Sequence, residues 1–127
     1  MSRKNRKAPR SKLLKSLLEE YPHGHPEFLP MLVEKMQLHS DKNHDYAAGG
    51  RPLGNFERVA AIFAQYPGLR LNDPVVVMLT YAMKQIDATL WGISAGIEQK
   101  IEGPVERLGD VLVYAGIAIC ALKDRAK

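Results

Sequence analysis

The sequence predicts an all-α protein: a bundle of four main helices, a short N-terminal helix and a basic tail that is disordered over residues 1–10. Apolar residues recur at helical spacing in each long segment, and no alternating strand pattern interrupts them. Proline and glycine stand between these segments, where they end one helix and open the next. A chain of 127 residues usually forms one domain, so we expect a single helical domain over residues 11–127.

The first two helices are indicated by capping residues and leucine spacing. Ser11 is placed to cap a short helix, Ser11–Glu20, whose leucines form one apolar stripe. The second helix, Pro26–His44, opens on a proline, which suits a first helical position. If this helix continues past His44, Asp41 and Asp45 lie on one face, because they are four residues apart.

A glycine-rich connector, residues 46–54, separates the second helix from the third. We expect the third helix over Asn55–Gln65, with Asn55 as its N-cap. Asp73 followed by Pro74 is a strong start signal for a fourth helix, Pro74–Ala95. That helix is apolar nearly all round, which places it at the centre of the bundle.

The last helix is predicted over Pro104–Lys123, with a core face made by Leu108, Val111, Leu112, Ala115, Ile119 and Leu122. Gly109 and Gly116 reduce its helix propensity, and we interpret them as points where two helices approach closely. Cys120, the only cysteine, lies in an apolar run and is expected to be a buried thiol. A single cysteine forms no internal disulfide, which fits a reducing cytoplasm.

Charge is distributed unevenly along the chain. Residues 1–15 hold seven Lys and Arg and no acid, while the remainder holds the other 11 basic residues and all 14 acidic ones. This argues against nucleic-acid binding by the folded body and leaves a weak, salt-sensitive contact open for the tail. The apolar segments 75–93 and 108–122 contain charged residues, so we expect no membrane span and a cytoplasmic location.

Polar stripes run along the two most apolar helices. The fourth helix carries Thr80, Lys84, Asp87, Trp91 and Ser94 at helical spacing, and Lys84 and Asp87 are placed to pair. The last helix carries Glu106, Asp110 and Tyr114 four residues apart, and Asp110 is expected to be buried. A buried charge must be paired, bind a metal or become neutral.

Two interpretations of these stripes remain open if both face the connector. Asp45, Asp87 and Asp110 meet Arg51, Arg58, Lys84 or Arg107 in a sealed ion-pair network that fixes helix register. Alternatively, the same residues line an open polar pocket. Several carboxylates on facing helices would suit Mg²⁺, whereas the cations, with the Asn55 helix start, would suit an anionic ligand. No Walker A loop or nucleophile elbow is present.

Four short motifs resemble a known family: Lys42-Asn43-His44-Asp45-Tyr46, Asn55-Phe56-Glu57-Arg58-Val59-Ala60, Met83-Lys84-Gln85-Ile86-Asp87 and Arg107-Leu108-Gly109-Asp110-Val111-Leu112-Val113-Tyr114-Ala115. The pattern is similar to small helical phage and prophage proteins of unknown function and to the nucleotide modification associated domain, type one. The resemblance spans roughly residues 30 to 120 and departs at Ala47, where the family has glycine. It implies a setting in phage nucleotide or modified-base metabolism.

A weaker similarity is to the all-α nucleoside triphosphate pyrophosphohydrolases. That family holds Mg²⁺ with Glu-x-x-Glu and Glu-x-x-Asp pairs. Here the spacing is Glu106-x-x-x-Asp110, and the central helices contain no Glu-x-x-Glu pair. This departure weakens the pyrophosphohydrolase interpretation.

The leading functional hypothesis is a phage-type cytoplasmic protein that binds a nucleotide or related phosphate and hydrolyses it with Mg²⁺. Asp45, Asp87 and Asp110 would be catalytic or metal ligands, with Glu106 as a further ligand. The expected ligand-binding residues are Tyr46, Arg51, Asn55, Arg58, Lys84, Trp91 and Tyr114. The alternative is a non-enzymatic accessory protein whose basic tail contacts nucleic acid. A homo-oligomer is expected under both hypotheses, because the bundle is small and its central helix very apolar.

Overall fold

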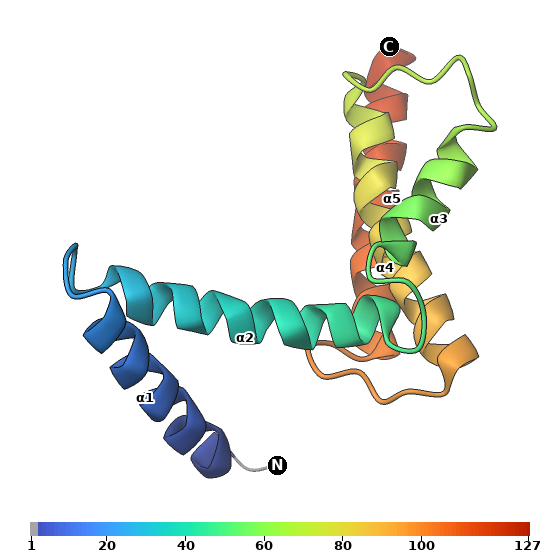
Figure 1. Cartoon of the computed structure of the whole chain (residues 1–127). Helices are drawn as coiled ribbons and strands as arrows, with labels where there is room; N and C mark the ends of the chain where they lie inside the picture. The colour runs from blue at the N-terminus through green and yellow to red at the C-terminus, as the bar shows by residue number, and fades with distance from the viewer. Residues whose placement is uncertain (1–2) are drawn as a thin grey trace. The chain divides into compact units, whose positions relative to one another are not determined.

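A computed structural model describes residues 3–127, and its described part contains helices and no strand, which confirms the all-α prediction (Figure 1). The five helices are α1 (Arg3–Glu20), α2 (Phe28–Ala47), α3 (Gly54–Phe63), α4 (Pro74–Ala95) and α5 (Pro104–Arg125). Residues 1 and 2 of the predicted tail lie outside the described residues.

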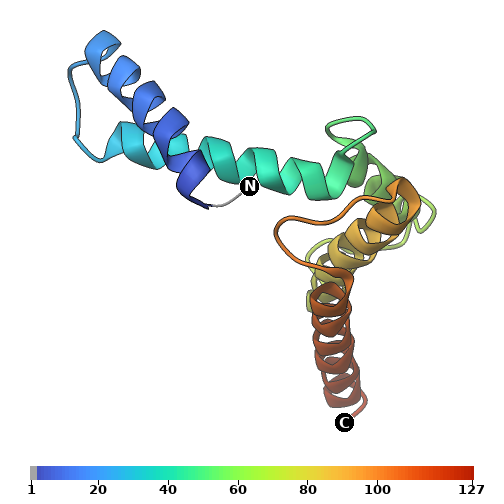
Figure 2. The ribbon, with the colours of Figure 1, turned by 90° about the horizontal axis from the view of Figure 1, so that it is seen from below.

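Helix contacts divide the chain into two compact units, residues 1–40 and residues 41–127. The last two turns of α2 therefore belong to the second unit, which also holds α3, α4 and α5. Within the second unit α4 packs against α5 and against α3, and α4 and α5 lie side by side in both ribbon views (Figures 1 and 2). The four-helix bundle is not confirmed by these contacts, and the single domain over residues 11–127 stays a prediction.

In the first unit, α1 begins at Arg3, although the sequence predicted a helix only from Ser11. Lysine, arginine and alanine have high helix propensity, so they allow a helix across the basic segment. The disordered tail over residues 1–10 is therefore not confirmed. Residues 21–27 separate α1 from α2 and contain two prolines and Gly24. The φ of Gly24 is 121°, a backbone conformation that mainly glycine adopts.

Helix α4 has the predicted bounds, because both of its ends carry strong local signals. The carboxylate of Asp73 accepts the backbone N–H of Val75 at 2.8 Å, and Pro74 occupies the first helical position. Gly96 ends the helix in the left-handed conformation, with φ 65°. Although α4 is the most apolar helix, no helix among the described residues is long and apolar enough to cross a membrane.

Helix α3 begins one residue earlier than predicted, and Asn55 is not its N-cap. The N-cap is Leu53, which contributes no side-chain hydrogen bond to the helix start. The φ of 82° at Gly49 belongs to the turn that follows α2, as the glycine-rich connector indicated. Asn55 is therefore left for a different role on the first turn of α3.

Helix α5 corrects two predictions about the core. Its packed side includes Arg107 and Ala118, whereas four of the six expected core residues are exposed: Leu108, Leu112, Ile119 and Leu122. Cys120 is exposed as well, not buried. These residues lie around the outer side of the helix, and only one side of α5 packs against α4. The apolar composition of α5 did not reveal which side was packed.

Candidate functional site

A buried carboxylate, Asp45, lies in the last turn of α2 and is fully enclosed, with a relative exposure of 0%. Its oxygens accept the backbone N–H groups of Lys100 at 2.6 Å and Ile101 at 2.7 Å, and they lie 3.0 Å from Nδ1 of His44. Burial raises the pKa of Asp45, but these hydrogen bonds and the charge of Arg107 outweigh it and leave the pKa below its ordinary value. The loop before α5 is thus fastened to α2 by one ionised side chain.

Arg107 is the cation of this buried cluster, and its side chain is also 0% exposed. Its Nη2 lies 3.4 Å from Oδ2 of Asp45. Its Nε donates to Oε1 of Gln99 at 2.5 Å, and its Nη1 donates to Oε1 of Gln85 at 2.7 Å. The side-chain amide of Gln85 in turn donates to the carboxylate of Asp110 at 2.9 Å, which extends the network to that residue. Arg107 also lies 3.7 Å from the carboxylate of Glu102, which is 40% exposed. Asp45, Asp110 and Arg107 thus share one ion-pair and hydrogen-bond network, as in the first of the two interpretations of the polar stripes.

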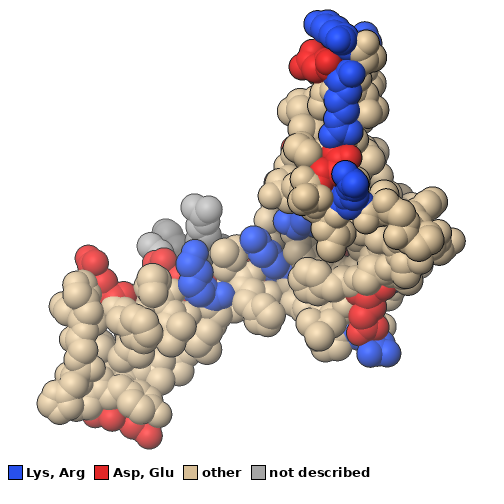
Figure 3. Space-filling view, turned by 90° about the horizontal axis from the view of Figure 1, so that it is seen from above, with Lys and Arg blue, Asp and Glu red and all other residues tan. Residues whose placement is uncertain are grey.

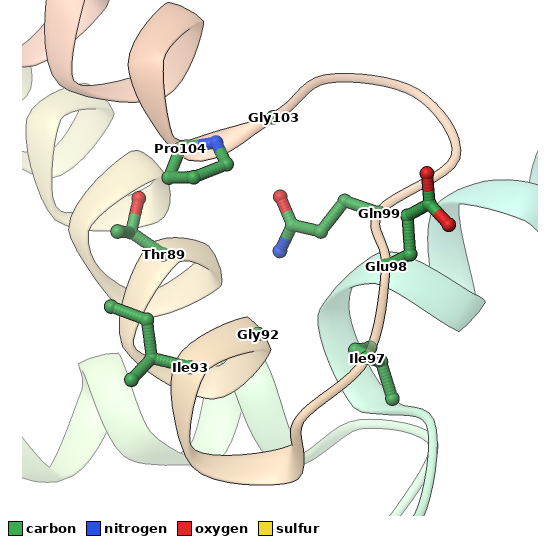
Figure 4. Close-up of a pocket in the computed structure, with 8 residues that line it drawn as sticks. All are labelled: Thr89, Gly92, Ile93, Ile97, Glu98, Gln99, Gly103 and Pro104. Atoms are coloured by element: carbon green, nitrogen blue, oxygen red, sulfur yellow. The ribbon is translucent and has the colours of Figure 1, made fainter.

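Gln99 reaches into the fold from the loop between α4 and α5. Figure 4 shows its side chain pointing toward Thr89 and Gly92 on α4. Its Nε2 donates to the carbonyl of Ala88 at 2.7 Å, and a Cβ on Gly92 would stand only 2.8 Å from that nitrogen. Gly92 therefore provides the space that lets Gln99 hold Arg107. Gln99 also lines a hollow of about 360 Å³ beside it, together with Thr89 and Glu98, and its amide is already bonded to Arg107 and Ala88.

A second ion pair joins α3 to α4. Arg58 donates to both carboxylate oxygens of Asp87, at 2.7 and 2.8 Å, and contacts the carbonyl of Tyr46 at 3.3 Å. Its guanidinium lies 4.3 Å from the centre of the Trp91 ring. The hydrogen bond to Asp87 raises the pKa of Arg58, despite the opposing effect of burial. The expected Lys84–Asp87 pair is thus replaced by a bidentate Arg58–Asp87 pair.

Trp91 fixes the connector to α4. Its Nε1 donates to the carbonyl of Ala48 at 3.0 Å. A Cβ at Gly50 would lie 2.7 Å from two carbons of the indole, so only glycine lets the backbone pass this close. The predicted ligand residue Trp91 therefore binds the protein's own backbone and stacks against Arg58.

An open cavity of about 320 Å³ lies next to these networks. It is lined by Tyr46, Asn55, Phe56, Val59, Thr80, Tyr81, Lys84 and Asp87. Lys84 is exposed, and its Nζ lies 5.6 Å from the centre of the Tyr46 ring. Oδ1 of Asn55 is buried and has no hydrogen-bond partner among the described residues. The cavity thus combines aromatic walls with one exposed cation, and one of its lining residues, Asn55, carries a buried amide oxygen without a partner among the described residues.

The remaining predicted site residues lie at the edge of this arrangement or outside it. Tyr114 packs edge-on against Tyr81, with ring centres 5.7 Å apart. Arg51 is 79% exposed and pairs with Glu57 at 2.9 Å. Glu106 accepts the backbone N–H of Gly103 at 3.1 Å and so caps α5.

The three predicted metal-binding aspartates do not converge. Asp45 and Asp110 belong to the Arg107 network, whereas Asp87 pairs with Arg58. Among the residues that the structure describes, no group of three or more His, Cys, Asp or Glu side chains could hold a metal ion.

Sequence reasoning missed the importance of two glutamines and undervalued Arg107. Arg107 was named only as one of several partners for the buried carboxylates. Gln85 interrupts an apolar helix, which is a signal that could have been used, because a buried amide needs partners. Gln99 lies in a loop without any pattern, and only the fold brings it to Arg107.

Comparisons with known proteins add no assignment: no protein-family model, no curated protein and no solved structure matches this chain.

Proposed function

We propose that the cavity beside Lys84 binds a nucleotide or a related small phosphate compound. The observation that carries the proposal is the composition of the cavity wall: Tyr46, Asn55 and Lys84 come from three different helices and line one opening. A volume of about 320 Å³ is at the small end of the range for ligand pockets, roughly 300 Å³ upward. A nucleoside monophosphate fits this size class better than a larger cofactor.

Each part of such a ligand has a candidate partner. The rings of Tyr46, Phe56 and Tyr81 offer apolar faces for a base. Lys84 supplies the positive charge that a phosphate needs. The Oδ1 of Asn55 is a buried acceptor without a donor among the described residues, and a rotation of this side chain toward the cavity would let an amino group on a base satisfy it. Asp87 is neutralised by Arg58, which removes a charge that would repel the phosphate.

In this proposal the Arg107 network holds the cavity walls in place and does not touch the ligand. Mg²⁺ stays in the proposal as a companion of the ligand's phosphates, because it is usually held by one or two carboxylates together with phosphate oxygens. Of the three carboxylates predicted to be catalytic, Asp87 lines the cavity, whereas Asp45 and Asp110 belong to the Arg107 network. Hydrolysis in this hypothesis would therefore involve Asp87, and the phage-type, cytoplasmic setting remains part of the hypothesis.

Calorimetric titration tests the proposal with purine and pyrimidine nucleoside monophosphates, the matching nucleosides and inorganic phosphate, each with and without Mg²⁺. We expect saturable binding of a monophosphate that is weakened about tenfold or more in Lys84→Met, because a charge-assisted hydrogen bond is lost. Lys35→Met is the matched control, since Lys35 is an exposed lysine on α2 that does not line the cavity. The proposal is wrong if no nucleotide binds, or if Lys84→Met binds as tightly as the wild type.

The alternative, an accessory protein with a nucleic-acid-contacting tail, is supported by the seven basic residues in the first 15. It predicts a strongly salt-dependent association that does not need the cavity. Deletion of residues 1–12 therefore separates the two functions.

A further inference from the structure

The outer side of α5 is an apolar surface that nothing in the described chain covers. The helix packs on α4 through the side that carries Arg107 and Ala118. Val105 and Leu112, which lie two helical turns apart on the other side, are 79% and 75% exposed. A monomer with this face in water would expose apolar side chains along most of a 22-residue helix.

A regular seam runs along the middle of this outer face. Its positions alternate in spacings of three and four residues, as in a coiled coil: Glu106, Gly109, Val113, Gly116, Cys120 and Lys123. No charged residue interrupts the seam between its two ends. A Cβ placed on Gly109 or Gly116 would meet no atom of the described residues within 4 Å, so neither glycine is needed for packing among them.

From this seam we infer that α5 pairs with α5 of a second copy of the chain, and that the two helices run antiparallel. The ends of the seam carry opposite charges: Glu106 in the first turn and Lys123 in the last. Figure 3 shows Lys and Arg groups gathered at the end of the α4–α5 pair where α5 terminates. In an antiparallel pair each acidic end meets a basic end, whereas a parallel pair would bring like charges together. Opposed helix dipoles favour the same orientation.

The charge match also sets the register of the two helices. When Glu106 lies beside Lys123 of the second copy, Gly109 lies beside Cys120 and Val113 beside Gly116. Each glycine thus faces a larger side chain, which lets the helices approach closely. This register gives the two seam glycines a function that they lack in the single chain.

Sedimentation equilibrium, which measures the mass of the full chain in solution, tests whether a second copy covers the outer side of α5. We expect a dimer whose dissociation constant rises about a hundredfold or more in Val113→Glu, because two carboxylates would be buried without partners. Leu71→Glu is the control, since Leu71 is 80% exposed and lies in the loop before α4. The inference is overturned if the wild type is a monomer, which is the result expected when residues 1–40 of the same chain cover this face. It is also overturned if the Val113→Glu variant still forms the dimer.

Charge variants test the orientation without placing a charge in the middle of the seam. Lys123→Glu should raise the dissociation constant about tenfold, because it sets a carboxylate beside Glu106 of the second copy. Lys127→Glu makes the same change outside the seam and should leave the constant near the wild-type value. Equal constants for the two variants contradict the antiparallel pairing.

Mild oxidation tests the register directly, using the native Cys120 as one partner. Gly109→Cys should give a disulfide-linked dimer that joins position 109 to Cys120, because a disulfide requires Cα atoms within roughly 7 Å. The wild-type chain should not cross-link. Efficient Cys120–Cys120 cross-linking of the wild type would show a parallel pair and overturn the inferred geometry.

Discussion

Replacing Arg107 with methionine should break the network that joins α2, α4, α5 and the loop before α5. The side chain is fully buried and donates to Asp45, Gln99 and Gln85. Methionine fills a similar space but donates no hydrogen bond. In Arg107→Met the carboxylate of Asp45 keeps its backbone donors, yet it loses the only buried cation beside it among the described ion pairs.

The expected loss of stability is about 3–5 kcal/mol, the usual effect of removing one partner from a buried ion pair. The two glutamine oxygens that lose their donor place the loss toward the upper part of that range. For a chain of 127 residues, we expect the melting temperature to fall by roughly 10–20 °C.

Urea and thermal unfolding followed by circular dichroism provide the assay. Arg51→Met is the matched control, because Arg51 pairs with Glu57 on the surface and is 79% exposed. An exposed pair contributes about 0–1 kcal/mol, so the control should unfold close to the wild type. If Arg107→Met is destabilised by no more than Arg51→Met, the network does not hold the second unit together and the reasoning is refuted.

Three further predictions concern Asp45, Gly50 and the basic N-terminal segment. The pKa of Asp45 lies below its ordinary value, so the stability that its charge contributes is complete above about pH 4 and is lost as the pH falls through the lowered pKa. Acid titration should therefore show the gap between wild type and Asp45→Asn narrowing in acid; a constant gap contradicts this. Gly50→Ala should destabilise the protein by about 1–3 kcal/mol and change the emission of Trp91, the only tryptophan, because the added Cβ meets the indole at 2.7 Å. Gly68→Ala, where a Cβ meets nothing within 4 Å, should do neither. Deleting residues 1–12 should abolish salt-sensitive binding to DNA or RNA and leave nucleotide binding unchanged. If the shortened protein still binds nucleic acid, the hypothesis that the tail makes this contact is wrong.

Local signals explain what the sequence predicted well. Asp73, Pro74 and Gly96 define α4 because capping and backbone preference act within a few residues. The polar stripe of α4 also marked Lys84 and Asp87, which the structure brings to one cavity with Tyr46.

Features that depend on distant contacts were not predictable in the same way. Arg107 meets Gln99 only because the loop folds back beside α4, and no periodicity describes a loop. Cys120 lies in the apolar run of residues 117–122, so composition alone did not distinguish the packed side of the helix from its outer side. Asn55 precedes a helical pattern like an N-cap, but the chain enters α3 one residue earlier.

The central claim is that a phosphate-bearing ligand occupies the cavity beside Lys84. Backbone amide NMR spectra recorded while the full chain is titrated with a nucleoside monophosphate test it most directly. The claim predicts saturable shifts at Lys84, Tyr81 and Phe56, and in Lys84→Met the shifts at Tyr81 and Phe56 should need about tenfold more nucleotide or greater. Shifts confined to the basic N-terminal residues, or none at any position, would contradict it.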